Sequence, residues 1–231
     1  MKTIGLIGGM SWESSLEYYR TINTEVNARL GGLHSAECLL YSVDFAEIER
    51  LQSAGEWHEA GEQLGRVAYK LEQAGADFIV ICTNTMHKVV AEIEEKISIP
   101  VLHIADTTAA EIGRRKLAKV GLLGTRYTME QEFYRSRIES HGIEVVVPAS
   151  GQRQEINRII FEELVAGKLL QSSKETFQQV IRELVAEGAE GIILGCTEIG
   201  LLIKPEDATL PLFDTAQIHA IQAVNLALEE L

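Results

Sequence analysis

An internal repeat constrains the fold of this chain more than any other feature of its sequence. Three segments of the first half recur in the same order in the second half, and the separation between matched glycine, cysteine and proline positions stays between 111 and 116 residues. The matched pairs are KTIGLIGGM at 2–10 with KVGLLGTRYTM at 119–129, AGADFIVICTNT at 74–85 with EGAEGIILGCTE at 187–198, and IPVLHIADT at 99–107 with LPLFDTA at 210–216. Chance similarity between apolar segments would not preserve both order and spacing, so the sequence predicts two homologous halves.

Short apolar runs bounded by glycine alternate with longer segments of helical period, which is the pattern of βαβ units in parallel sheets. The predicted strands are 3–7, 37–42, 78–82, 101–104, 119–123, 144–147, 191–194 and 210–213. The sequence therefore predicts an α/β fold of two similar open parallel-sheet domains, related by a pseudo-twofold axis. If the chain passes from one domain to the other at the strand after each cysteine motif, the first domain comprises 1–100 and 209–231, and the second comprises 101–208.

Composition and charge exclude several classes of partner. Hydrophobic residues make up 46% of the chain and charged residues 24%, as in ordinary folded proteins. The formal net charge of -13, without a basic run, argues against nucleic acid and anionic membranes as partners. The N-terminal apolar stretch is too short for a signal peptide, and no apolar run is long enough to span a membrane. We expect a cytoplasmic protein.

The three cysteines are widely spaced and odd in number, so neither a disulfide framework nor a zinc site is predicted. Cys38 has no counterpart in the repeat, whereas Cys82 and Cys196 occupy equivalent positions. Each of these two ends a predicted buried strand and is followed by threonine, a residue type that caps helices. A helix N-terminus beside each thiol would favour thiolate, although a cysteine that ends an apolar strand can also be a simple core residue.

Two thiols in symmetric positions suit one particular reaction. A free cysteine has a pKa of about 8.5, so a modest shift would leave one sulfur as thiolate and the other as thiol near neutral pH. Racemisation at Cα needs such a pair, because one group removes the proton from one face and the other supplies a proton to the opposite face. The strand ends that carry both cysteines are expected to face one inter-domain cleft, where open α/β sheets bind ligands.

Other chemistry is less well supported by the sequence. GLIGGM at 5–10 lacks the spacing of a dinucleotide-binding loop and the lysine of a phosphate-binding loop, so we interpret Gly8 and Gly9 as a turn that lets backbone approach a ligand closely. The six histidines show no metal-binding spacing, and His87 is expected to be a supporting or core residue. We therefore predict no cofactor and no metal.

The motifs GLIGGMSWESS, CTNTMH and GCTEIG resemble those of the aspartate/glutamate racemase family over essentially the whole chain. YSVDF, LLGTRYTMEQ and INRIIFEEL are similar to stretches of bacterial aspartate/glutamate and broad-specificity amino-acid racemases. The resemblance implies two α/β domains that each supply one catalytic cysteine, no pyridoxal phosphate, and a homodimer. It makes Cys82 and Cys196 the catalytic pair.

The same resemblance implies which residues bind an amino-acid substrate. Thr83, Asn84 and Thr85 would hold its amino and carboxylate groups. Met10 and Thr197 would complete that wall. Lys168 matches a position at which relatives that act on dicarboxylates place a lysine, although a solvated lysine in a turn is an equally good interpretation. Gln52 is expected to face the substrate where such relatives place an arginine, which leaves the preference for acidic or neutral side chains open.

The predicted function is therefore a cofactor-independent racemase of L- and D-aspartate or glutamate that works by a two-base thiol mechanism. A racemase of broader specificity, accepting for example homoserine, differs only in substrate. A related cysteine-dependent isomerase or decarboxylase would need only one essential cysteine. A non-catalytic small-molecule binding protein would keep the cleft without turnover.

Overall fold

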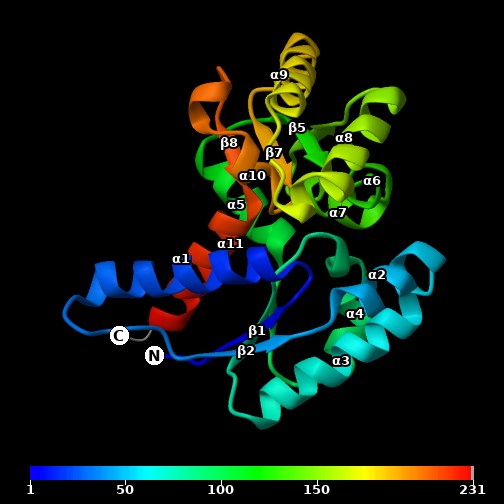
Figure 1. The fold of residues 1–231 in the computed structure, drawn as a ribbon. Coiled ribbons are helices and arrows are strands. Elements are labelled where there is room, and N and C mark those ends of the chain that lie inside the picture. The colour runs from blue at the N-terminus through cyan, green and yellow to red at the C-terminus, as the bar shows by residue number, and fades with distance from the viewer. Residues whose placement is uncertain (230–231) are drawn as a thin grey trace. The chain divides into compact units, whose positions relative to one another are not determined.

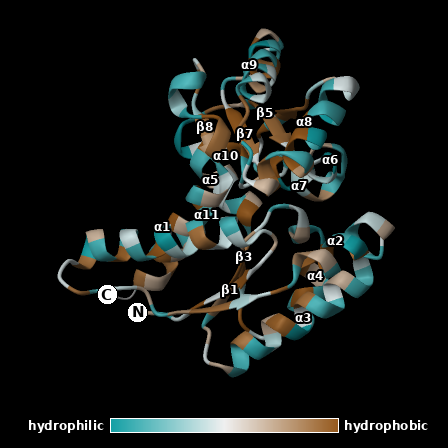
Figure 2. Cartoon of the chain, viewed as in Figure 1, coloured by the Kyte–Doolittle hydropathy of each residue, from teal (hydrophilic) through white to brown (hydrophobic). Residues whose placement is uncertain are grey.

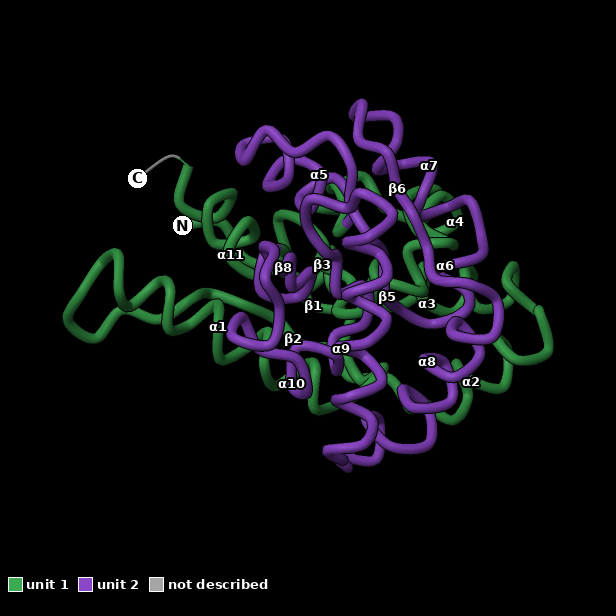
Figure 3. Tube along the Cα trace, turned by 90° about the horizontal axis from the view of Figure 1, so that it is seen from above, with its two compact units in different colours: residues 1–104, 219–231 green, residues 105–218 purple. Residues whose placement is uncertain are grey.

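The computed structural model describes residues 1–229 (Figure 1). The chain forms two compact units, which are coloured separately in Figure 3. Unit 1 contains residues 1–104 and the C-terminal segment that begins at His219. Unit 2 contains residues 105–218. Each unit is built around its own parallel sheet.

The sheet of unit 1 has four parallel strands in the order β2-β1-β3-β4. Their bounds are Ile4–Gly8 for β1, Cys38–Ser42 for β2, Phe78–Ile81 for β3 and Val101–Leu102 for β4. Every residue of β1 and β3 is buried, which explains why these central strands are continuous apolar runs rather than alternating ones. Edge strand β2 is only partly buried.

Helices cover both faces of this sheet. They are α1 (Trp12–Leu30), α2 (Phe45–Ala54), α3 (Trp57–Gln73), the 3-10 helix η1 (Thr85–Val89), α4 (Val90–Glu94) and α11 (Thr215–Leu228), which enters unit 1 at His219. Figure 1 shows α1 and α11 on one face of the sheet and α3 on the other. Leu64, Val67, Ala68 and Leu71 of α3 form the predicted buried stripe, and apolar and polar bands alternate along this helix in Figure 2.

The sheet of unit 2 repeats the same topology. Its strands are parallel in the order β6-β5-β7-β8, with bounds Lys119–Gly124 for β5, Glu144–Val146 for β6, Ile192–Gly195 for β7 and Leu212–Asp214 for β8. Its helices are α5 (Ile104–Arg114), α6 (Arg126–Glu130), α7 (Glu132–Glu139), α8 (Ser150–Glu162), η2 (Leu164–Ala166), α9 (Gln171–Ala186), α10 (Ile199–Leu202) and η3 (Pro205–Asp207). The three pairs of repeated sequence segments fall on β1 and β5, β3 and β7, and β4 and β8. The predicted pair of similar parallel-sheet α/β domains is confirmed.

The predicted domain boundaries differ from those of the units at both crossings. Residues 101–104 belong to unit 1 because β4 pairs with β3, and residues 209–218 belong to unit 2 because β8 pairs with β7. In each half the fourth strand completes its own sheet before the chain crosses. The predicted strand 101–104 is also shorter than expected, since α5 begins at Ile104. Within residues 1–229, no helix is long and apolar enough to cross a membrane.

A buried histidine fixes α11 to the rest of unit 1. His219 is fully buried, donates from Nε2 to the carbonyl oxygen of Leu102 (2.8 Å) and accepts at Nδ1 from the hydroxyl of Tyr18 (2.9 Å). Burial, together with the neighbouring His87, lowers the pKa of His219 to about 3. Both hydrogen bonds use the neutral ring, so α1, α11 and the end of β4 are joined through a neutral imidazole.

This arrangement predicts a pH-dependent contribution to stability. Above pH 6.5 His219 is neutral in the folded and unfolded chain; as the pH falls toward 3, only the unfolded chain takes up the proton. The free energy of unfolding should therefore drop by up to about 1.4 kcal/mol per pH unit in this window. We expect His219→Gln to be less stable than the wild type at pH 7.5 and to lose most of that difference at pH 5.0.

Fluorescence-monitored urea unfolding tests this prediction, because both tryptophans, Trp12 and Trp57, lie in unit 1. Replacing the exposed His34 with glutamine is the matched control and should leave the pH dependence of stability unchanged. An equal stability difference between wild type and His219→Gln at both pH values would contradict the role given to His219.

Candidate active-site residues

Strand order gives each sheet one position that is suited to bind a ligand. In the order β2-β1-β3-β4, the chain leaves β1 toward one edge and β3 toward the other, so their carboxyl ends flank the topological switch point. Cys82 is the residue that follows β3, and Cys196 follows β7, the equivalent strand of unit 2. Each cysteine therefore lies at the switch point of its own sheet.

Cys82 is held by the sheet and closed off from solvent. Its side chain is fully buried, its backbone N–H donates to the carbonyl oxygen of Ile7 (2.9 Å), and Sγ lies 4.0 Å from the carbonyl oxygen of Val80. Burial raises the pKa of the Cys82 thiol. The segment that follows forms only the short 3-10 helix η1, so the predicted thiolate-favouring helix N-terminus does not outweigh desolvation.

Cys196 has a carboxylate beside it. Its Sγ donates a hydrogen bond to Oε2 of Glu198 (3.0 Å), and the hydroxyl of Thr197 donates to the same oxygen (2.8 Å). Burial, and then the charge and hydrogen bond of Glu198, raise the pKa of the Cys196 thiol; backbone N–H groups of residues 198 and 199 oppose them. As at Cys82, burial shifts the thiol pKa in the direction opposite to the predicted lowering.

The turn after β1 depends on its glycines, for a reason that differs from the predicted one. Gly9 has φ of +93°, and a Cβ added there would lie 2.2 Å from the carbonyl oxygen of Val43. Its N–H donates to the hydroxyl oxygen of Ser15 (2.8 Å), which in turn donates to the carbonyl oxygen of Ser11 (2.9 Å). The group that approaches Gly9 closely is thus the backbone after β2, and the turn is locked against the start of α1.

The predicted binding residues of unit 1 cluster around three neighbouring segments. Met10 after β1, Leu51 of α2 and Met86 of η1 belong to one hydrophobic core cluster. Of the predicted binding residues in unit 1, four are buried and one is half-buried. The buried residues are Met10, Gln52, Asn84 and Thr85, and the half-buried residue is Thr83. Gln52 follows Leu51 in α2, so each of the three segments that carry these residues contributes a side chain to the same core cluster.

The two predicted residues of unit 2 lie apart in the sequence and differ in exposure. Thr197 is half-buried and bonded to Glu198, as described above. Lys168 is exposed in the segment between η2 and α9, where its backbone N–H donates to the carbonyl oxygen of Glu163 (2.9 Å). The side chain of Lys168 is therefore a solvent-accessible cation on unit 2.

From the sequence, Glu198 could help to orient groups near the thiols, but it is not included in the predicted site because a helix-capping or solvated role explains it at least as well. In the structure this side chain is buried and bonded to the Cys196 thiol. The spacing Cys-x-Glu was the available signal. It was insufficient, since a side chain two residues further on can contact the cysteine only if the turn folds back toward the strand end.

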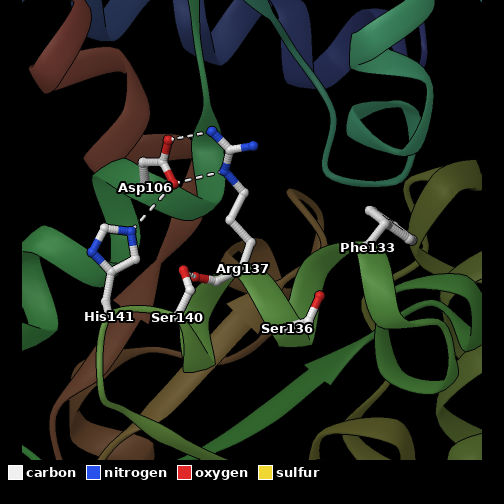
Figure 4. Close-up of a pocket in the computed structure, with 6 residues that line it drawn as sticks. All are labelled: Asp106, Phe133, Ser136, Arg137, Ser140 and His141. Atoms are coloured by element: carbon white, nitrogen blue, oxygen red, sulfur yellow. Dashed lines mark hydrogen bonds and ion pairs between the residues drawn. The ribbon is translucent and has the colours of Figure 1, made fainter.

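Two surface pockets lie away from these residues. The one in unit 2, of about 540 Å³, is shown in Figure 4 and is lined by Asp106, Phe133, Ser136, Arg137, Ser140 and His141. Arg137 forms two 2.7 Å bonds to Asp106, and His141 lies 3.4 Å from the same carboxylate. The hydroxyls of Ser136 and Ser140 donate to helix carbonyls. The polar groups of this pocket thus satisfy one another.

The second pocket, of about 480 Å³, lies in unit 1 beside the carboxyl end of β2. It is lined by residues of β2, α2, α3 and the turn between β2 and α2, which include Asp44, Arg66 and Lys70. None of the predicted site residues lines either pocket. Across residues 1–229, no group of three or more His, Cys, Asp or Glu side chains is arranged to hold a metal ion.

The contact between Glu198 and Cys196 predicts how the thiol titrates. Glu198→Gln removes the negative charge and the carboxylate that accepts the Sγ proton, so the pKa of Cys196 should fall. Peptide-resolved mass spectrometry of iodoacetamide alkylation as a function of pH should show the Cys196 curve moving to lower pH and the Cys82 curve unchanged. Glu206→Gln, which removes an exposed glutamate of the same unit, should leave both curves in place. Superimposable Cys196 curves for Glu198→Gln and wild type would contradict this interpretation.

Comparison with known proteins identifies the family. The family model described as Asp/Glu/hydantoin racemase matches residues 7–223. The chain is 29% identical over 158 residues to the broad specificity amino-acid racemase RacX of Bacillus subtilis, covering 68% of each protein. The solved structure of a putative Asp/Glu racemase from Yersinia pestis is 55% identical, with a TM-score of 0.93 and coverage of 99% of this chain and 100% of that one.

A second solved structure, of an aspartate racemase homologue from Pyrococcus horikoshii OT3, is 39% identical with a TM-score of 0.84. The alignment covers 98% of this chain and 99% of that one. The shared fold extends over both sheets, including the strand ends that carry the two cysteines. The chain belongs to the Asp/Glu/hydantoin racemase family.

Proposed function

We propose that this protein is a cofactor-independent amino-acid racemase that interconverts the L and D forms of aspartate or glutamate, with Cys82 and Cys196 as its two acid–base groups. One observation carries the proposal: in a member of this family, a cysteine follows the equivalent central strand of each of two topologically identical sheets, at the switch point of each. A two-base reaction needs two such groups of the same chemical kind.

The reaction is balanced in protons. A thiolate at one cysteine takes the Cα proton, and the electron pair left behind is delocalised into the substrate carboxylate. The thiol of the other cysteine then donates its proton to the opposite face of Cα and becomes the thiolate. For the reverse reaction the roles are exchanged, so neither direction requires an external acid or base in the proton-transfer steps.

Formation of the first thiolate is the step that burial opposes. Desolvation raises the pKa of both thiols, so a proton must leave one of them once the substrate is bound. Oε2 of Glu198, 3.0 Å from Sγ of Cys196, is the acceptor that this proton needs. The cationic α-amino group of the substrate would stabilise the thiolate that results. We therefore assign Glu198 as the group that accepts the proton of Cys196.

Substrate recognition follows from the same site. We propose that Thr83, Asn84 and Thr85, with Met10 and Thr197, hold the α-amino and α-carboxylate groups. Lys168 and Gln52 would contact the side chain of the substrate. The exposed cation of Lys168 favours a side-chain carboxylate, while the uncharged Gln52 gives only hydrogen bonds. A preference for acidic amino acids is the result. The predicted homodimer stays a prediction.

The two-base mechanism predicts distinct behaviour of the two cysteine variants. Cys82→Ser and Cys196→Ser should each lose racemisation by roughly 10³-fold or more, because a serine hydroxyl is a far weaker acid than a thiol. In D₂O, each variant should still exchange the Cα proton of one enantiomer, a different one in each case, since one thiol remains. Chiral chromatography and mass spectrometry measure both processes. Cys38→Ser, outside the repeat, is the control and should keep the wild-type rate.

Full racemase activity in either of these variants would exclude the two-base mechanism and favour an enzyme with a single essential cysteine. Absence of racemisation and of Cα exchange in the wild type, across a panel of acidic and neutral amino acids, would exclude a racemase. Ligand-induced stabilisation of the protein without exchange would then indicate a binding protein.

The role of Lys168 is tested by substrate preference. Lys168→Met should raise KM for aspartate or glutamate by about 10- to 100-fold, the value of one hydrogen bond to a charged group, and leave kcat/KM for neutral amino acids unchanged. Lys116→Met removes another exposed lysine of unit 2 and serves as the control. Equal losses with acidic and neutral substrates would show that Lys168 does not contact the side-chain carboxylate.

A further inference from the structure

Three buried histidines of unit 1 are not used by the proposed reaction. His87, His103 and His219 have exposed fractions of 2%, 5% and 0%. The ring centroid of His87 lies 4.6 Å from that of His103 and 5.7 Å from that of His219, with the rings edge to face. His87 lies in η1, His103 directly follows β4, and His219 lies in α11. Burying an imidazole costs free energy unless its nitrogens form hydrogen bonds. The hydrogen-bond partners of these rings therefore indicate their structural role.

His87 bridges two backbone segments through its two ring nitrogens. Nδ1 lies 2.8 Å from the carbonyl oxygen of Thr83, and Nε2 lies 3.2 Å from the backbone nitrogen of Ile104. A carbonyl can only accept, so Nδ1 carries the proton; Nε2 then accepts from the N–H of Ile104. Ile104 is the first residue of α5. The neutral ring of His87 thus caps α5 and holds the carbonyl of the residue after Cys82.

Both segments that connect the units end at this histidine cluster. Ile104, bonded to His87, is the last residue of unit 1 before the chain enters unit 2. His219 is the first residue of unit 1 after the chain returns, and its ring contacts that of His87. His219 in turn holds Leu102 and Tyr18, as described above. One imidazole therefore lies between the Cys82 segment and both connections.

We propose that His87 is a positioning residue for Cys82, whose ring fixes the Cys82–Thr83 backbone to the start of α5 and, through His219, to the returning helix α11. The inference rests on the proposed function in so far as it takes Cys82 to be a reacting group. An apolar residue of similar size could fill the same space, but it could not join the Thr83 carbonyl to the Ile104 N–H. The thiol stays in place because the rigid ring holds both backbone groups at once.

Paired substitutions separate positioning from packing. His87→Leu removes both hydrogen bonds but keeps much of the apolar volume, whereas His87→Gln retains an amide that can donate and accept. In His87→Leu, iodoacetamide should alkylate Cys82 about ten-fold faster relative to Cys196 in the same molecule, because the Cys82 segment is no longer held. Racemase kcat should fall about 10- to 100-fold, with KM changed much less, as expected for a displaced reacting group. His87→Gln should recover a substantial part of both effects.

Val26→Ala is the stability control, since Val26 is a fully buried core residue of α1 in the same unit. At temperatures chosen to give equal fractions of unfolded protein, this variant should show the wild-type ratio of Cys82 to Cys196 alkylation. The positioning role is overturned if His87→Leu also shows the wild-type ratio, if it matches Val26→Ala, or if His87→Gln recovers nothing. The alkylation ratio does not require turnover, so an inactive wild type would refute the proposed racemase and still leave the ratio to decide the role of His87.

Discussion

Pairing between two buried central parallel strands, β1 with β3 and β5 with β7, is the interaction on which the rest of each unit depends. Each pair brings together two carboxyl ends whose connections leave in opposite directions. In open α/β sheets the crevice at such a point is where ligands bind, and the residues that follow these strands stand at that position. Cys82 and Cys196 occupy it because each directly follows the second strand of its pair. The location of each thiol is a consequence of strand order.

The same burial that builds the sheets sets the chemistry of the thiols. Apolar strands covered on both faces leave the residues at their ends poorly solvated, and this desolvation raises the pKa of Cys82 and Cys196. In the proposed reaction, a thiol with a raised pKa keeps the proton that it must donate but forms the thiolate base less readily. The two units differ in the groups beside the thiol. Cys196 has the Glu198 carboxylate as hydrogen-bond acceptor, whereas Cys82 is followed by uncharged Thr83 and Asn84.

Sequence patterns predicted the features that depend on neighbouring residues and missed those that depend on distant ones. The repeat and the apolar runs predicted two parallel sheets, and these are present. The predicted domain boundaries at 100 and 209 differ from the unit boundaries because β4 and β8 each belong to the sheet of the strand with which they pair. The composition of β4 and β8 alone does not show which strand that is. The raised thiol pKa could not be foreseen, since burial is a property of the folded chain. His87, His103 and His219 come from segments up to 132 residues apart and show no spacing.

The histidine cluster also explains how two sheets that share a topology can differ in the way their cysteines are held. In unit 2, Cys196 is bonded directly by a side chain two residues further along. In unit 1 the residue after Cys82 is bonded by a ring that also binds the first N–H of α5, so the Cys82 segment is coupled to the path of the chain between the units. A duplicated fold thus supplies two chemically equivalent thiols, and residues that differ between the two halves make them unequal: Cys196 is bonded to a carboxylate, and the residue after Cys82 is bonded to His87.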